Sequence, residues 1–495
     1  MGWRLEVDAE PVPSVPDLDA EQAAVVAHRR GPLLVLAGPG TGKTTTIVEA
    51  IAARLSDPED HLPADAILAL TFGRRAALEL RDRVTARVGG GLIPTIATFH
   101  SFAFGLLQQT ATPEEYANPP RLMSGAEEDV RIRELLRGAV VDGSVDWPED
   151  LIGALPTLGL ANEVRAVLAR ARELGLDGPA LRRIGRAENR PAWVAVGQLV
   201  QQEQEVMALE NVLDYSELVL QAVVRAQDPQ VQSRLRSRYR AIYVDEYQDT
   251  DPLQVALLRA LVGPDTCVVA VGDPDQAIYG FRGADMHGLL RFPQTFRTAA
   301  NEPAPIIVLR TARRFGPRIR AAAGSVLGTR LPVGLPPDLL LRHRQPACAE
   351  VADPAIDDLI TLRTFPDRGS QAAHVAREIR QAHVRRSVPW TQMAVLVRSS
   401  ADIPPIHRAL RAAGIPAVVA ADEIPLKNEP AVATLLAVLS LAASPATASP
   451  TQVLDVLSGP IVGLTPSDLR RLGRALDFQD HCKLNGSKFT SRSET

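Results

Sequence analysis

Lys43 is the only lysine in the first 426 residues, in a chain whose other basic residues are almost all arginine. It lies in a glycine-rich segment that reads AGPGTGKT from Ala37 to Thr44, which is the P-loop pattern with alanine in its first position. Glycines let backbone N–H groups curl around phosphate oxygens, and a lysine supplies a point charge to the β- and γ-phosphates. The hydroxyl of Thr44 suits Mg²⁺. The segment predicts an ATP·Mg²⁺ site made of Ala37, Gly38, Pro39, Gly40, Thr41, Gly42, Lys43, Thr44 and Thr45.

Two adjacent acids, Asp245 and Glu246, directly follow the apolar run AIYV at 241–244. In a phosphate-transfer site the first acid would hold Mg²⁺, directly or through water, and the second would orient and deprotonate the attacking water. Such pairs also occur by chance after strands. The catalytic interpretation therefore depends on both acids sharing one sheet with the phosphate loop.

The elements that must position these residues alternate between short apolar runs and helical patterns, which is typical of a parallel α/β sheet flanked by helices. Residues 105–235 have no strand alternation and predict a long helical insertion, and the chain turns helical again after Val419. Helices are expected at 19–29, 43–55 and 74–88, and strands at 32–36, 66–71, 94–98, 241–244 and 267–271. Two further strands, at 303–309 and 393–397, are expected to belong to a second α/β unit.

The composition is that of a globular protein of about three domains, since 495 residues are 46% hydrophobic and 23% charged. The net charge of −4 gives no global basic field. Three cysteines without a CxxC pair argue against a cysteine-based metal site or a disulfide framework. We expect no signal peptide, no membrane span and a cytoplasmic location.

The segment VDEYQDT at 244–250 resembles the Walker B signature of UvrD/Rep-type superfamily 1A DNA helicases. The longest further match is VGDPDQAIYGFRGA at 271–284, which resembles motif III of that family almost throughout. Shorter segments follow in family order: Leu18-Asp19 with Gln22, Thr71 to Ala77, TFHSF at 98–102 and Leu213 to Tyr215. The resemblance spans about residues 18 to 420.

This resemblance implies two RecA-like P-loop cores with helical insertions, ATP between the cores and single-stranded DNA, or DNA with a single-stranded tail, as partner. It implies an ATP-dependent 3′→5′ helicase or translocase in DNA repair or recombination. The expected divisions are an arm at 1–17, a first core at 18–104 and 206–298, a helical insertion at 105–205, a partial second core at 299–412, the start of a second insertion at 413–481 and an atypical tail at 482–495.

The resemblance also assigns roles to single residues. Gln22 would read adenine, Gln276 would sense the γ-phosphate, and Arg314 would be the arginine finger. Ala312 and Arg313 replace the Asn and Tyr of the family pattern, so an arginine plane would have to replace the tyrosine that stacks on adenine. The expected DNA-contacting residues are Thr71, Phe72, Phe99, His100, Tyr279, Phe281 and Arg282.

Aromatic side chains on this track would stack on bases, although Phe99 and Tyr279 could instead be core residues. Within the family, the GPGTGKTTT, TFGRRAA and RRFGPRI segments resemble actinobacterial helicase–nuclease subunits of the AdnAB type, the A subunit in particular, which would imply a second subunit as partner. The family's motifs V and VI are absent, so we expect a truncated chain. The alternative function is a fragment that binds ATP and DNA with little or no unwinding alone.

Overall fold

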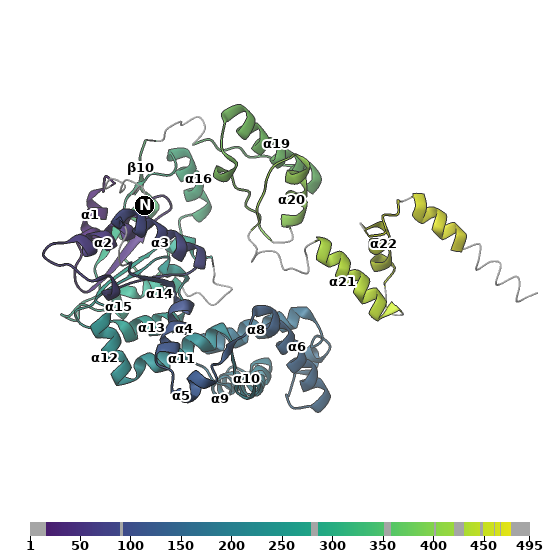
Figure 1. The fold of residues 1–495 in the computed structure, drawn as a ribbon, viewed down its shortest axis with the longest axis horizontal. Coiled ribbons are helices and arrows are strands. Elements are labelled where there is room, and N and C mark those ends of the chain that lie inside the picture. The colour runs from purple at the N-terminus through teal and green to yellow at the C-terminus, as the bar shows by residue number, and fades with distance from the viewer. Residues whose placement is uncertain are drawn as a thin grey trace, which may run out of the picture. The chain divides into compact units, whose positions relative to one another are not determined.

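The computed structural model describes residues 16–89, 93–278, 286–350, 358–399, 402–419, 430–445, 449–459, 461–465 and 467–476. The chain divides into two compact units, Met1–Ile360 and Thr361–Thr495 (Figure 1). Nearly all of the expected arm at 1–17 and the whole tail at 482–495 lie outside the described residues.

The first unit is built on a six-stranded sheet with the strand order β3-β2-β6-β7-β1-β8, in which every neighbouring pair is parallel. The strands are β1 (Pro32–Ala37), β2 (Ile67–Thr71), β3 (Thr95–Thr98), β6 (Ala241–Val244), β7 (Cys267–Gly272) and β8 (Ile306–Leu309). Their continuous apolar runs fit strands buried on both faces. The predicted α/β class and its first five strands are confirmed.

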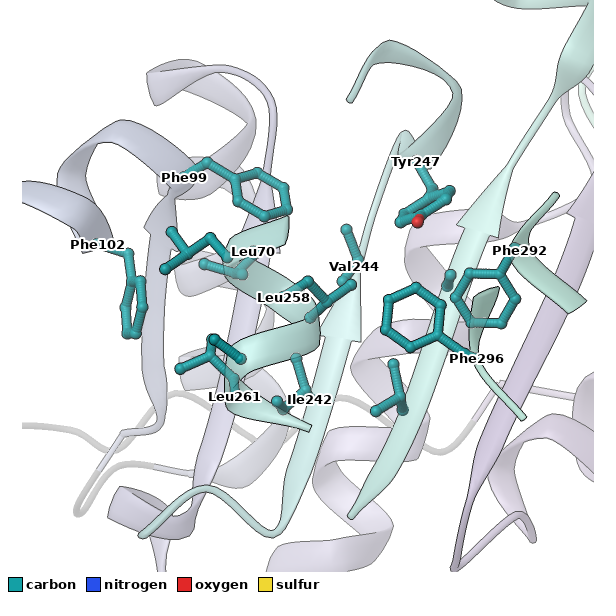
Figure 2. Close-up of a cluster of buried hydrophobic side chains, with 14 of the residues drawn as sticks. Leu70, Phe99, Phe102, Ile242, Val244, Tyr247, Leu258, Leu261, Phe292 and Phe296 are labelled. Carbon is teal, nitrogen blue, oxygen red and sulfur yellow. The ribbon is translucent and has the colours of Figure 1, made fainter. Parts of the chain in front are cut away.

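Helices cover both faces of this sheet (Figure 1). Alternate residues of β1 enter two separate cores: Leu33 and Val35 pack against α1 (Ala20–Val26), α2 (Lys43–Ser56) and α3 (Arg74–Val88). Leu34 and Leu36 face the other core, formed with α4 (Phe99–Gln109), α11 (Tyr215–Gln227), α12 (Pro229–Arg238) and α13 (Pro252–Leu261). Figure 2 shows the aromatic and aliphatic side chains of this second core.

The expected insertion at 105–205 is helical and has a hydrophobic core of its own. Its helices are α5 (Pro113–Ala117), α6 (Gly125–Asp142), α7 (Glu149–Ile152), α8 (Leu158–Glu173), α9 (Gly178–Ala187) and α10 (Pro191–Glu210). One short parallel pair, β4 (Arg121–Leu122) with β5 (Val212–Leu213), joins its two ends. The expected boundaries after residues 104 and 205 fall inside α4 and α10, so both helices run continuously through them.

Two predictions about the expected second core are wrong. The strand expected at 303–309 is β8, which pairs with β1 in the first sheet, because the edge of that sheet offers a buried partner for its apolar residues. The first unit then continues through β9 (Thr311–Ala312), α16 (Pro317–Leu327), α17 (Pro337–Arg344) and β10 (Ala347–Cys348), with β9 and β10 paired in parallel.

The segment 393–397 forms no strand. A strand needs a hydrogen-bonding neighbour, and the described part of the second unit contains none. That unit packs α19 (Arg368–Arg386) against α20 (Ile403–Ala412) around Ala376, Leu410 and Ile415, and continues with α21 (Pro430–Ala443) and α22 (Pro450–Ser458). None of the helices described is long and apolar enough to cross a membrane.

Candidate nucleotide-binding site

The predicted phosphate loop connects the carboxyl end of β1 to the first turn of α2. Gly40 and Gly42 have φ angles of +73° and +87°, in the left-handed region that favours glycine. Gly42 is the N-cap of α2 and no side chain caps that helix end. Because the first N–H groups of a helix have no internal partner, this end is free to bind an anion.

Gln22, the predicted adenine reader, lies against the same loop. Its carboxamide donates to the carbonyl of Thr41 over 3.2 Å, and a reciprocal capping box with Asp19 fixes its position at the start of α1. A Cβ added to Gly42 would lie 2.5 Å from Gln22 Nε2 and would displace that carboxamide. The side chain of Gln22 thus closes one side of the loop.

The acidic pair lies at the carboxyl end of β6, in the same parallel sheet as the loop. Lys43 Nζ is 3.0 Å from Glu246 Oε2, which joins residues about 200 positions apart in sequence. Asp245 is only 7% exposed, and this burial, with the neighbouring Glu246 charge, raises its pKa to about 6. Glu246 adopts a φ of +51°, a strained value for a non-glycine residue that is typical of functional sites.

Gln248 is a site residue that we did not predict. It is fully buried, donates from Nε2 to Glu246 Oε2 over 2.8 Å, and accepts from the backbone N–H of Asp273 over 3.0 Å. Asp273 in turn accepts from Gln276 Nε2 over 2.6 Å. A chain of hydrogen bonds therefore runs from the acidic pair to the predicted γ-phosphate sensor. The sequence signal that could have identified Gln248 is its position among polar residues immediately after a buried strand.

Arg314 also reaches the loop. The N–H of Arg313 donates to the carbonyl of Gly40 over 2.8 Å, and a Cβ added to Gly40 would lie 2.8 Å from the Cβ of Arg314. The Arg314 side chain is exposed. Arg313 also pairs with Asp19 over 3.0 Å, so the segment at Arg313 contacts both the phosphate loop and the start of α1.

Comparison with known proteins identifies the family of this chain. A family model described as the UvrD/REP helicase N-terminal domain matches residues 18–297, more than half of the chain. The chain belongs to the UvrD/Rep helicase family. It is similar to the ATP-dependent DNA helicase UvrD2 of Mycobacterium tuberculosis, with 29% identity over 439 residues, covering 81% of this chain and 55% of the relative.

It is also similar to the ATP-dependent DNA helicases PcrA of Staphylococcus epidermidis and Staphylococcus aureus. The first is 26% identical over 81% of this chain and 50% of the relative. The second is 27% identical over 78% of this chain and 48% of the relative. The chain thus spans about half the length of these curated relatives.

The residues predicted to hold Mg²⁺ fit a divalent cation. Asp245 is a buried carboxylate beside a second one; burial first, and the Glu246 charge second, raise its pKa, and a bound cation would offset both effects. Thr44 lies half-buried in the first turn of α2, next to Lys43. Hard oxygen ligands of this kind are those that Mg²⁺ prefers.

The predicted DNA-contacting residues of this UvrD/Rep-family chain divide into three groups. Phe99 is 2% exposed in the core beneath the sheet (Figure 2), and Thr71 is fully buried at the end of β2, so neither side chain can stack on or contact DNA; these two predictions are wrong. Phe72 and His100 are half-buried and follow the neighbouring strands β2 and β3. Tyr279, Phe281 and Arg282 lie outside the described residues.

His100 packs edge-to-face against Tyr215, with ring centroids 5.4 Å apart. Burial, and to a lesser extent the Arg74 charge, lowers the pKa of His100 below its ordinary value, so the imidazole is neutral at pH 7. A neutral ring beside an aromatic ring offers an apolar surface to a base rather than a charge to a phosphate.

Proposed function

We propose that this chain hydrolyses ATP to drive 3′→5′ movement on single-stranded DNA, as a helicase or translocase of the UvrD type in DNA repair or recombination. The observation that carries the proposal is the 3.0 Å contact between Lys43 and Glu246, which places a phosphate-binding cation and a candidate general base together. The relatives' names, ATP-dependent DNA helicases, support the DNA-linked part.

The geometry suggests an order of events in the site. In this structure the Lys43 ammonium pairs with Glu246 and occupies one oxygen of that carboxylate. Phosphates entering the loop attract Lys43 toward the β- and γ-oxygens, and Glu246 is then free to accept a proton from water. Hydrolysis would thus depend on phosphate arrival.

Other side chains would recognise the nucleotide and its transition state. Gln22 would contact adenine from the edge of the loop, and the exposed Arg314 would approach the γ-phosphate from the side of Gly40. When bound to Thr44 and Asp245, Mg²⁺ would neutralise charge on the phosphate oxygens. Gln276 would contact the γ-phosphate from the end of the hydrogen-bonded chain that begins at Glu246.

Single-stranded DNA, or DNA with a single-stranded tail, is the proposed partner. Phe72 and His100, at the carboxyl ends of β2 and β3, are the described residues that we assign to its bases. Membership of the AdnAB type, a second helicase–nuclease subunit and a cytoplasmic location stay predictions. The alternative, an ATP- and DNA-binding chain with little unwinding of its own, is kept because the chain spans only about half the length of these relatives.

Steady-state ATP hydrolysis with and without single-stranded DNA tests the proposal. The unchanged chain should show DNA-stimulated turnover, Lys43→Ala should lose nucleotide binding, and Glu246→Gln should bind ATP but lose at least about 100-fold in kcat. Arg342→Ala, an exposed change in α17, is the control. Nucleotide binding without stimulation would favour the alternative, and normal turnover by Glu246→Gln would refute the assigned base.

A further inference from the structure

Two consecutive residues at the end of α17 hold the loop that follows β7. His343 Nε2 lies 2.8 Å from Asp273 Oδ1. Arg344 donates to both carboxylate oxygens of Asp275, over 2.8 Å from Nε and 2.5 Å from Nη2. His343 is 3% exposed and Asp273 is 0% exposed. These residues lie about 70 positions apart in sequence, and no local pattern predicts their contact.

The other side of His343 faces the phosphate loop. A Cβ added to Gly38 would lie 3.7 Å both from His343 Cε1 and from the His343 carbonyl oxygen. The imidazole is therefore packed between the loop and the Asp273 carboxylate. Its second ring nitrogen, Nδ1, is buried and has no hydrogen-bond partner among the residues that the structure describes.

Asp273 connects His343 to the proposed sensor. While Oδ1 accepts from His343, Oδ2 accepts from Gln276 Nε2 over 2.6 Å. Burial works to raise the pKa of Asp273, but the hydrogen bonds and charge from His343, with the Gln276 hydrogen bond, bring the pKa below its ordinary value. The carboxylate is thus ionised. His343 fixes one oxygen and so orients the other, to which Gln276 is bound.

The same group, Asp273, Asp275 and His343, has the composition of a metal site, with possible ligand atoms within 4.8 Å of one another. The existing contacts argue for a different role. The guanidinium of Arg344 occupies both oxygens of Asp275, and His343 already serves one oxygen of Asp273. A cation would have to displace Arg344, so the group is a hydrogen-bonded ion-pair cluster.

We propose that His343 is a positioning residue for γ-phosphate recognition. By holding Asp273 against the phosphate loop, it fixes Gln276 where the γ-phosphate arrives, so the chain distinguishes ATP from ADP. The proposal rests on the ATP-dependent function proposed above. A residue that only filled space beneath the loop would support both nucleotides equally, since the loop itself binds the phosphates that they share.

Calorimetric binding of ADP and of a non-hydrolysable β,γ-imido analogue of ATP, both with Mg²⁺, tests this. His343→Ala should weaken binding of the triphosphate by about tenfold or more while changing ADP affinity by less than about twofold, because one hydrogen bond to a charged group is lost from the sensor side alone. Gln276→Ala should reproduce this loss, and the double variant should show no further loss. His343→Asn, which keeps a donor, should restore part of the preference.

Arg342→Ala, one residue before in α17 and exposed, is the matched control and should bind like the unchanged chain. Equal weakening of both nucleotides, or additive losses in the double variant, would overturn the proposal and leave His343 with a packing role. If His343→Ala does not fold, the His343→Asn and Gln276→Ala variants decide by the same ratio. An unchanged chain that binds neither nucleotide would instead refute the proposed function itself.

Discussion

Replacing Gln248 by glutamate changes one atom of the site and reverses its hydrogen bonding. The glutamine Nε2 donates to Glu246 Oε2 over 2.8 Å and to Asp249 Oδ2 over 3.2 Å, whereas its Oε1 accepts from the backbone of Asp273. In Gln248→Glu the acceptor is kept, but an ionised oxygen faces two carboxylates. A lost hydrogen bond to a charged group costs about 1.5–3 kcal/mol, and like-charge repulsion adds to it.

We therefore expect Gln248→Glu to lower the free energy of unfolding by about 3 kcal/mol at pH 8. Protonation of the introduced carboxyl restores a donor, so its folded-state pKa lies above its unfolded value, by about two units for that energy. The defect is then present above the raised pKa and shrinks as pH falls toward 5.

Urea unfolding of both chains at pH 5 and pH 8 measures this difference. Gln201→Glu is the matched control, because Gln201 also donates to a carboxylate, that of Glu205, over 3.3 Å on an exposed helix surface. It should cost only about 0.5 kcal/mol or less at either pH. An equal defect of Gln248→Glu at both pH values would mean a steric cause and would refute the electrostatic reasoning.

Three shorter predictions concern the nucleotide site and the proposed DNA track. Gly40→Ala should weaken ATP binding by at least about tenfold in calorimetry, since the added Cβ would lie 2.8 Å from the Cβ of Arg314. Gly31→Ala is the control, because Gly31 has a similar φ of +74° but open space around it. It shares the backbone strain and should bind ATP normally. Asp245→Asn should stabilise the nucleotide-free chain at pH 8 by up to about 3 kcal/mol and not at pH 4. The reason is that the pKa of Asp245 is raised to about 6 in the folded chain, so the unchanged chain loses stability as pH rises from about 4 to 6. Phe72→Ala should weaken single-stranded DNA binding in fluorescence anisotropy by about 1–3 kcal/mol, and unchanged affinity would remove Phe72 from the proposed DNA track.

The part of the site that could be predicted lies where short sequence signals and sheet geometry agree. Lys43 and Glu246 each follow an apolar run, and the carboxyl ends of parallel strands meet at one edge of a sheet. The predicted strands therefore place both residues at one edge, and the structure adds their 3.0 Å contact. The predicted helix at 74–88 has its observed bounds, and its end carries a local signal, because Gly89 closes it in the left-handed region.

Other residues escaped prediction for physical reasons. His343 contacts Asp273 only through the tertiary fold, since α17 carries no motif. Which sheet β8 would join depends on the edge that is open, which periodicity does not encode. The burial of Phe99, by contrast, could have been predicted from the sequence. The i, i+3, i+4, i+7 spacing of Phe99, Phe102, Ala103 and Leu106 already indicates the buried face of α4.

Lys43 and Gln248 both donate to Glu246 Oε2, but only Gln248 also accepts from the backbone of Asp273. In the proposed order of events phosphate draws Lys43 away; Gln248 Nε2 would then remain as a donor to Glu246, while Gln248 Oε1 would still accept from the backbone of Asp273. A shift of Gln248 would then move the proposed base and the support of Gln276 together. A buried amide therefore joins the residues proposed to activate water and to sense the γ-phosphate.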